Sequence, residues 1–386
     1  MRQAPTIAIV GAGPAGLTLA NVLQRHGWRA DVFETDASVD ARDQGGSLDL
    51  HPEEGQRALA RAGLLDAFMA IARHEDQETR LVHHATGQLL REQIPAPGEG
   101  DRPEIDRQAL RALLLHPLAA GVVRWGERLE AVLPRADGRH DLRCASGVKG
   151  PYDLVVGADG AWSKVRAALT PALPAYTGVT FIELWLRDVD RRHPRAARLV
   201  GHGTLFALHG GAGIVGQRNG NATLRVYAAL RTGAATGASP DPALAAIGKD
   251  ALLARFAGWA PSLLDLIAEA EGIAAVRPIM ALPPGLRWPH RAGLTVIGDA
   301  AHVMPPLGVG VNLAMLDAAE LAEALVGADD WRAGQRRGEE SMWARAAGIA
   351  PGCIEALADM FDDNGARALV EQMEAHARRD GAGLSR

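Results

Sequence analysis

The chain has 386 residues, with 41 basic and 46 acidic side chains and a formal net charge of −5 at pH 7. This balance, without a long basic run, argues against nucleic acid as a partner. No apolar run approaches the roughly 20 residues of a membrane span, and Met1 leads almost directly into a strand pattern, so we expect a cytoplasmic protein without a secretory leader. The two cysteines, Cys144 and Cys353, fit no metal spacing, and we expect buried reduced thiols and no metal site.

The N-terminal apolar run at 6–10 is followed by GAGPAG at 11–16 and then by a helical pattern. In such a unit Gly11 allows a sharp turn, Gly13 lets a pyrophosphate approach the backbone, and Gly16 lets the helix pack closely on the strand. The free amides and positive end of the helix then face the phosphates. We expect this segment to bind an ADP-containing dinucleotide.

A second apolar run at 30–33 ends in Glu34, where a carboxylate can accept hydrogen bonds from a ribose. A tight strand-to-helix turn with a solvated glutamate is the alternative. In the loop at 41–51, Arg42 can meet a phosphate and Asp49 can bind a sugar hydroxyl, although a solvated loop with a charged rim would have the same composition. Residues 52–73 are predicted to be helical.

Short strands are predicted between 79 and 90, around the turn residues Thr86 and Gly87. A further helix begins at 105, with Asp106 as its N-cap and Arg107 in its first turn. The helix dipole opposes a cation there, and an anionic ligand would resolve the conflict. The alternative is an arginine that points to solvent.

Two later strands end in glycine-rich turns. The apolar run at 153–156 leads into GADGAWSKVR at 157–166, which contains Asp159. The run at 294–297 leads into GDAAHVMPPLGVGVN at 298–312 and then into a long helix. Such turns place backbone amides at the carboxyl edge of a parallel sheet, where ligands bind. His302 is expected to be a loop histidine that hydrogen-bonds to backbone rather than a catalytic base.

The segment from about 171 to 277 is predicted to form mostly antiparallel strands, with Asn219-Gly220 as a two-residue hairpin turn and a helical pattern from about 241 to 270. Its inward side chains would select the substrate, and Glu183, Phe206 and Arg225 are the candidates. Glu183 and Arg225 either recognise a substrate or pair with each other across the sheet. A helical segment is expected over 331–386.

The motifs GxGxxG, Asp-Gly and Gly-Asp-Ala-Ala-His occur here in the order seen in the single-component, class A flavoprotein monooxygenases, which the sequence resembles. GGSLDLHPEEGQRAL, EIDRQALR, GADGAWSKVR and GDAAHVMPP are most similar to the tetracycline-inactivating, TetX-like monooxygenases. The resemblance implies an α/β fold with a Rossmann-like FAD-binding domain of the p-hydroxybenzoate hydroxylase type at 1–78, 96–170 and 278–330. A mostly antiparallel substrate domain at 79–95 and 171–277 interrupts it, and 331–386 forms a C-terminal helical segment.

The resemblance also implies FAD as the bound cofactor and NADPH and O2 as co-substrates, with no second nucleotide-binding fold. The implied activity is hydroxylation of an electron-rich aromatic, phenolic or enolic small molecule, of polyketide or tetracycline type, through a C4a-hydroperoxyflavin. Because the flavin supplies the chemistry, no catalytic side chain is assigned. The residues implied or inferred to contact the cofactors are Gly11, Gly13, Ala15, Gly16, Glu34, Arg42, Asp49, Arg107, Asp159, Asp299, Pro306, Gly308, Gly310 and Val311.

Two alternatives stay open. One is a flavin-dependent halogenase or dehydrogenase on the same fold, although the halogenase signature Trp-x-Trp-x-Ile-Pro is absent at Trp185-Leu186-Arg187. The other is a non-catalytic flavoprotein that sequesters an antibiotic or serves as a scaffold. Oxygen transfer to the ligand would separate an enzyme from a binder.

Overall fold

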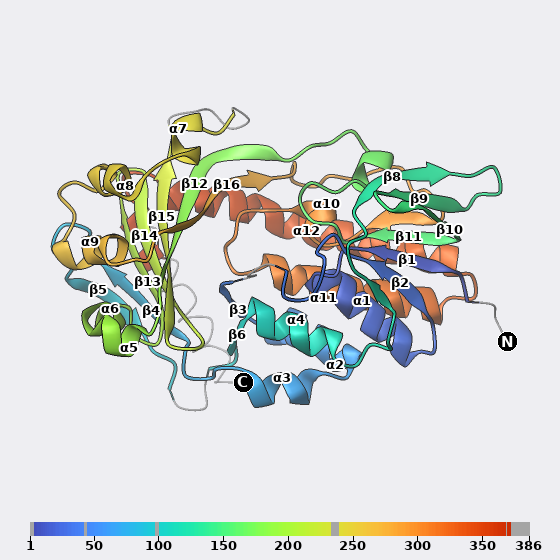
Figure 1. Cartoon of the computed structure of the whole chain (residues 1–386), viewed down its shortest axis with the longest axis horizontal. Coiled ribbons are helices and arrows are strands. Elements are labelled where there is room, and N and C mark those ends of the chain that lie inside the picture. The colour runs from blue at the N-terminus through green and yellow to red at the C-terminus, as the bar shows by residue number, and fades with distance from the viewer. Residues whose placement is uncertain (1–3, 42–44, 97–99, 233–238, 368, 372–386) are drawn as a thin grey trace. The chain divides into compact units, whose positions relative to one another are not determined.

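The computed structural model describes residues 4–41, 45–96, 100–232, 239–367 and 369–371. The chain forms two compact units, each built from three segments (Figure 1). Unit 1 comprises Met1–Ala72, Ile105–Ala175 and Met280–Cys353, and unit 2 comprises Arg73–Glu104, Tyr176–Ile279 and Ile354–Arg386.

A five-stranded parallel sheet forms the centre of unit 1, with the strand order β17-β11-β1-β2-β7. Its strands are β1 (Ile7–Val10), β2 (Ala30–Phe33), β7 (Val123–Arg124), β11 (Leu154–Gly157) and β17 (Leu294–Val296). All four residues of β1 and of β11 are buried, as expected of a parallel sheet that is covered on both faces. The predicted strands before the three glycine-rich motifs and before Glu34 are confirmed.

The helices of unit 1 contribute side chains to the hydrophobic core that contains this sheet. They are α1 (Pro14–Arg25), α2 (Arg57–Ala62), α3 (Leu65–Ile71), α4 (Arg107–Leu115), α10 (Asp299–His302), α11 (Gly310–Gly327) and α12 (Trp331–Met360), with the helical turns η1 (Pro52–Gln56) and η2 (Arg166–Ala168). Helices α1 and α11 pack against each other, and α12 continues into unit 2 after Cys353. The helical structure predicted over 52–73 is present in η1, α2 and α3, and the chain turns between α2 and α3 at Gly63, which has a φ of 73°.

The chain also forms two smaller sheets. One is antiparallel, with the order β10-β9-β8, and the other pairs β3 with β6. Their bounds are β3 (Ser47–Asp49), β6 (Glu104–Asp106), β8 (Leu129–Pro134), β9 (His140–Cys144) and β10 (Gly147–Tyr152).

Unit 2 contains a seven-stranded sheet with the order β16-β12-β15-β14-β13-β4-β5. Its strands are β4 (Glu78–Val82), β5 (Leu89–Gln93), β12 (Ala175–Leu186), β13 (Gly203–His209), β14 (Ala212–Asn219), β15 (Thr223–Arg231) and β16 (Ile273–Ala281). The predicted antiparallel sheet is confirmed, although β13 and β4 pair in parallel. The predicted two-residue turn is wrong: Asn219 pairs with Thr223, and Asn221 and Ala222 take positive φ angles in a three-residue loop.

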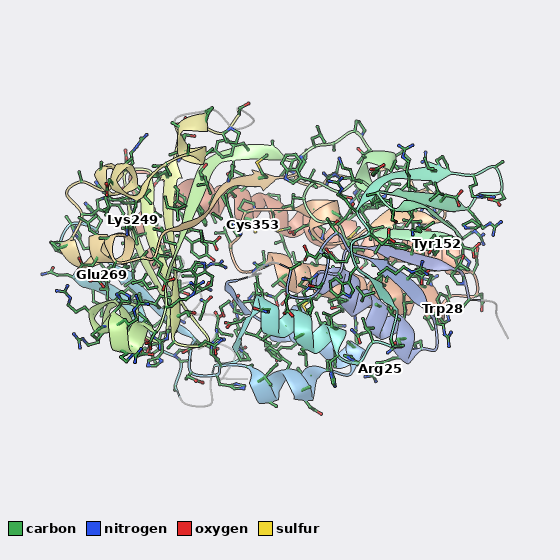
Figure 2. All side chains as sticks on the ribbon, viewed as in Figure 1. Arg25, Trp28, Tyr152, Lys249, Glu269 and Cys353 are labelled. Carbon is green, nitrogen blue, oxygen red and sulfur yellow. The ribbon has the colours of Figure 1, made fainter. Side chains whose placement is uncertain are left out.

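One face of this sheet is aliphatic and packs on helices. Ile182, Leu184 and Leu186 of β12 belong to a core that includes side chains of α6 (Pro194–Val200), α8 (Lys249–Arg255) and α9 (Pro261–Ala268). Lys249 donates to the carbonyls of Ala268 and Ala270 at the end of α9 (Figure 2). The sequence pattern gave no sign of α5 (Val189–Arg192) and α6, whereas the helical pattern at 241–270 corresponds to α7 (Pro242–Ala245), α8 and α9.

Candidate functional site

In the turn between β1 and α1, two glycines occupy positions where a side chain would clash, and the third glycine leaves free space. Gly11 has a φ of 106°, and a Cβ atom there would lie 2.3 Å from the carbonyl oxygen of Ala158. A Cβ atom on Gly16 would lie 2.0 Å from the carbonyl oxygen of Gly11, whereas one on Gly13 would have nothing within 4 Å. Gly13 is the N-cap of α1, and no side chain caps that helix. An anionic group can therefore approach the free amides of α1 through the space beside Gly13.

Glu34 at the end of β2 is buried, and local hydrogen bonds hold its carboxylate in place. Its Oε2 accepts from the amide of Ala12 at 2.7 Å, and its Oε1 accepts from the amide of Asp36 at 2.9 Å. A carboxylate offers about four acceptor positions. Glu34 thus fixes the glycine-rich turn and retains the capacity to accept a ribose hydroxyl.

Arg111 of α4 is a site residue that the sequence did not reveal. Its side chain is 2% exposed, and it donates from Nε to the carbonyl of Ala12 at 3.1 Å and from Nη1 to Asp36 at 3.1 Å. Its Nη2 lies 3.5 Å from Oε2 of Glu34 but has no hydrogen-bond partner in the part of the chain that the structure describes. The only local signal was its position between the buried Leu110 and Leu114.

Arg107, one turn before Arg111, has an exposed side chain for which no partner is found among the described residues. Its amide donates to the carbonyl of Gly46 at 3.0 Å, which ties the start of α4 to the loop before β3. Asp106 occupies the N-cap position, as predicted, but makes no side-chain capping hydrogen bond. Arg42 lies outside the described residues.

Asp159 holds together the turn after β11. Its carboxylate accepts from the Ser163 hydroxyl at 2.5 Å and from the amides of Lys164 and Val165 at 2.7 and 3.2 Å. Burial raises the pKa of Asp159, and these hydrogen bonds oppose that shift. The predicted contact of Asp159 with FAD or NADPH stays a prediction; the structure gives this carboxylate a role in shaping the turn.

The turn after β17 presents Asp299 with an exposed side chain, and within the described ranges its carboxylate has no partner. Ala300 in the same turn accepts a hydrogen bond at 2.9 Å from Arg166, which belongs to the Asp159 loop. The two predicted loops therefore meet, as the order of β11 and β17 requires.

Among the described residues, the ring of His302 hydrogen-bonds to a side chain and not to backbone, so that part of the expectation is wrong. Its Nε2 lies 2.5 Å from Oδ2 of Asp317, whose Oδ1 is 3.2 Å from Nε of Arg345. Burial alone would lower the pKa of His302, but the charge of Asp317 and its hydrogen bond outweigh that effect and raise the pKa. His302 thus joins α10 to α11 as a buried ion pair.

Asn312 connects the first turn of α11 to the strand that carries Asp49. Its Nδ2 donates to the carbonyls of Asp49 and Gly308 at 2.9 and 3.0 Å, and its Oδ1 accepts from the amide of His51 at 2.9 Å. Asn312 is fully buried, and its place in the motif at 298–312 does not by itself indicate this role.

The predicted segment from Pro306 to Val311 forms the entrance to α11. A Cβ atom on Gly308 would lie 3.5 Å from Oδ1 of Asp49, and one on Gly310 would have nothing within 4 Å. No side chain in the described part of the chain caps α11. This second helix N-terminus therefore lies beside the Asp49 carboxylate and is free to stabilise negative charge on a ligand.

Glu183, Phe206 and Arg225 lie on the sheet face of unit 2 that is opposite the helix-packed face. In the strand register, Glu183 lies opposite Tyr227, Tyr227 lies opposite Val215, and Val215 lies opposite Phe206. Glu183 and Arg225 form an ion pair, so the pairing alternative is observed. Their contact with a substrate stays a prediction.

The features of unit 1 fit a flavin dinucleotide. An open helix N-terminus can receive a pyrophosphate, Glu34 can receive a ribose, and the unpaired Asp299 can receive a polyol hydroxyl. Ala15 lies in the first turn of α1, where a Cβ atom on Gly298 would be 3.4 Å from it, so the first and last motifs are adjacent.

Comparisons with known proteins agree with this fit. The FAD binding domain family model matches residues 4–243 and 287–337. Monooxygenase asqM of Emericella nidulans is 34% identical over 374 residues, covering 83% of this chain and 83% of that protein. Kynurenine 3-monooxygenase of Stenotrophomonas maltophilia is 30% identical, covering 96% of this chain and 82% of that protein. Tetracycline destructase Tet(55) has the same fold, with a TM-score of 0.70 and 23% identity over 92% of this chain and 90% of that chain.

No helix among the described residues has the length and apolar character of a membrane span. The predicted fold class and the resemblance to class A flavin monooxygenases are confirmed by the family match and the related proteins. The chain belongs to the FAD binding domain family and is an FAD-dependent monooxygenase.

Proposed function

We propose that the enzyme consumes NADPH and O2 to hydroxylate an electron-rich aromatic, phenolic or enolic small molecule. The observation that carries this proposal is the gathering of three ligand-ready features in unit 1: the open N-terminus of α1, the unpaired Asp299 and the uncapped N-terminus of α11. When bound there, FAD supplies the redox chemistry that activates oxygen.

The side chains of unit 1 bind and orient the cofactor in this proposal. Gly13 admits the pyrophosphate to the amides of α1, and Glu34 holds the ribose while Arg111 keeps that carboxylate in place. Asp299 accepts hydrogen bonds from the ribityl chain. The remaining proposed contacts are Gly11, Ala15, Gly16, Arg42, Asp49, Arg107, Asp159, Pro306, Gly308, Gly310 and Val311.

The first turn of α11 has the polarity that the chemistry requires. Its free amides would stabilise negative charge on the flavin when it is bound, and Asn312 fixes that turn against the Asp49 strand. We assign the flavin domain to unit 1 and substrate selection to the sheet of unit 2. No side chain is proposed as a general base.

The relatives named above support the class of substrate that we propose, because kynurenine 3-monooxygenase is named for a small aromatic amino acid and Tet(55) for tetracycline. Neither substrate is assigned to this chain.

The test is oxygen transfer by the purified, FAD-loaded protein. Phenols, aromatic polyketides and tetracyclines are screened for stimulation of NADPH oxidation, with NADH as the matched comparison, and products are analysed by mass spectrometry under ¹⁸O2. We expect at least one compound to gain one ¹⁸O atom. If ligands bind to the yellow protein and none is oxygenated across the panel, the chain sequesters its ligand and the proposal is wrong.

A further inference from the structure

His51 lies between two carboxylates, at the point where the chain leaves β3 and enters η1. Its Nε2 is 2.9 Å from Oδ2 of Asp49, and its Nδ1 is 3.6 Å from Oε2 of Glu54. An ionised carboxylate only accepts hydrogen bonds, so Nε2 of His51 is the donor to Asp49. The distance to Glu54 is too long for a hydrogen bond. His51 therefore holds Asp49, and not Glu54, by a directed hydrogen bond.

The backbone of His51 is hydrogen-bonded on both sides, so its ring has a defined position. Its amide donates to Oδ1 of Asn312 at 2.9 Å, and its carbonyl accepts from the amide of Gln56 at 3.0 Å. The side chain of His51 is 14% exposed. The chain itself therefore orders the ring that holds Asp49.

The contact with His51 uses only one oxygen of the Asp49 carboxylate. Its Oδ1 has no hydrogen-bond partner among the described residues. A Cβ atom on Gly308 would lie 3.5 Å from Oδ1 and 3.7 Å from Oδ2, so the carboxylate lies against the segment that enters α11. The free oxygen of Asp49 is therefore close to the uncapped N-terminus of α11.

A carboxylate in this position has an alternative partner. The free amides and the positive end of a helix attract a nearby carboxylate, which can cap the helix. A cap from Asp49 would occupy the donors of α11 that are proposed for the flavin. No side chain in the described part of the chain caps α11, and Oδ2 of Asp49 is bonded to His51 instead. The hydrogen bond from His51 thus keeps an acceptor and a set of donors free beside each other.

Resting on the proposed function, we propose that His51 is a positioning residue for the cofactor and that it acts through Asp49. It holds Oδ2 of Asp49, so that Oδ1 is free to accept a hydrogen bond from a hydroxyl group of the flavin nucleotide. The amides of α11 stay free for an acceptor atom of the same ligand. His51 is not among the cofactor residues that the sequence motifs predict.

The test is the dissociation constant of FAD for the full-length apo protein, measured by quenching of flavin fluorescence. His51→Leu removes the donor and should raise this constant about tenfold, the effect of one hydrogen bond to a charged group. His51→Gln keeps an N–H donor and should restore most of the affinity. In a protein that already carries Asp49→Ala, His51→Leu should have no further effect, because His51 acts through Asp49. A purely structural effect of the substitution would persist in that background.

Glu54→Gln is the matched control, because Glu54 is the other carboxylate beside His51 and its side chain is 28% exposed. It should change the dissociation constant by less than about twofold. Unchanged affinity in His51→Leu, an undiminished effect of His51→Leu in the Asp49→Ala background, no recovery in His51→Gln, or an equal loss in Glu54→Gln would overturn the inference. If the coupling is found and no compound is ever oxygenated, only the proposed function fails; oxygenation by a protein whose FAD affinity does not depend on His51 removes only this inference.

Discussion

Replacement of His302 by Gln tests whether a buried ion pair holds the Asp299 turn in place. His302 ends α10, the one-turn helix that begins with Asp299, and its Nε2 lies 2.5 Å from Oδ2 of Asp317 in α11. The side chains of His302 and Asp317 are 8% and 1% exposed, so solvent screens this pair weakly. The pair therefore fixes the distance between two elements that we propose to contact the flavin.

The expected cost follows from what Asp317 retains. Removal of one partner from a buried ion pair costs about 3–5 kcal/mol, and a hydrogen bond to a charged group contributes about 1.5–3 kcal/mol. Asp317 keeps Arg345, whose Nε is 3.2 Å away, and Gln can still donate a neutral hydrogen bond. We therefore expect the free energy of unfolding to fall by about 2–3 kcal/mol at about pH 6, the lower part of those ranges.

The sign of the pH dependence follows from the raised pKa of His302. A base whose pKa is higher in the folded than in the unfolded state contributes full stabilisation below the unfolded value, here 6.5, and loses it as the pH rises through the folded value. Beside Asp317, the exposed Asp299 carboxylate also favours the charged form. The stability difference between parent and variant should therefore narrow from about pH 6 towards about pH 9.

Urea denaturation of the apo protein at both pH values measures this difference, and fluorescence titration measures the dissociation constant of FAD. His290→Gln is the matched control, because Nδ1 of His290 lies 2.6 Å from the buried Glu339 in a pair that joins the segment before β17 to α12 and does not include α10. We expect both variants to lose stability and only His302→Gln to weaken FAD binding. A pH-independent stability deficit in His302→Gln, or equal FAD affinity in the two variants, would refute the reasoning.

Four further substitutions test the site. Asp299→Ala should raise the dissociation constant of FAD by about tenfold or more, because it removes an unpaired acceptor; unchanged flavin retention on gel filtration would contradict its role. Gly16→Ala should destabilise even the apo protein, because its Cβ would lie 2.0 Å from a carbonyl oxygen. Gly13→Ala should leave the melting temperature of the apo protein unchanged and weaken FAD binding. Thermal denaturation with and without FAD measures both effects. Asn312→Ala removes three hydrogen bonds and should cost about 2–4 kcal/mol in urea denaturation.

The parts of the site that the sequence predicted correctly are local. The turn at Gly11–Gly16 and the strand before Glu34 depend on glycine spacing and on short apolar runs, which the residues themselves display. The break at Gly63 is also local, but a helical pattern on both sides concealed it. The Asn219-Gly220 turn was misplaced because strand register, rather than dipeptide composition, decided which residues form the loop.

The residues that the sequence missed have distant partners. Arg111 donates to a carbonyl 99 positions earlier, and Asn312 joins a strand 263 positions earlier. Neither residue type at its position implies such a contact, because an arginine on a helix is usually solvated. His302 was recognised as structural, yet its partner Asp317 could be identified only once α10 and α11 were placed side by side.

Residues whose polar atoms are hydrogen-bonded within the chain hold its loops in place, whereas residues with free polar atoms are available to bind ligands. Asp159, Asn312 and His302 form hydrogen bonds with other residues of the chain, so they hold loops in place. Asp299 in unit 1 retains polar atoms without a partner in the part of the chain that the structure describes. Folding normally leaves few buried groups of this kind, whereas the exposed carboxylate of Asp299 is hydrated and is free to accept a hydrogen bond from a ligand. Such an acceptor suits the hydroxyls of a flavin nucleotide. Asp299 is therefore a carboxylate that we propose to bind the cofactor.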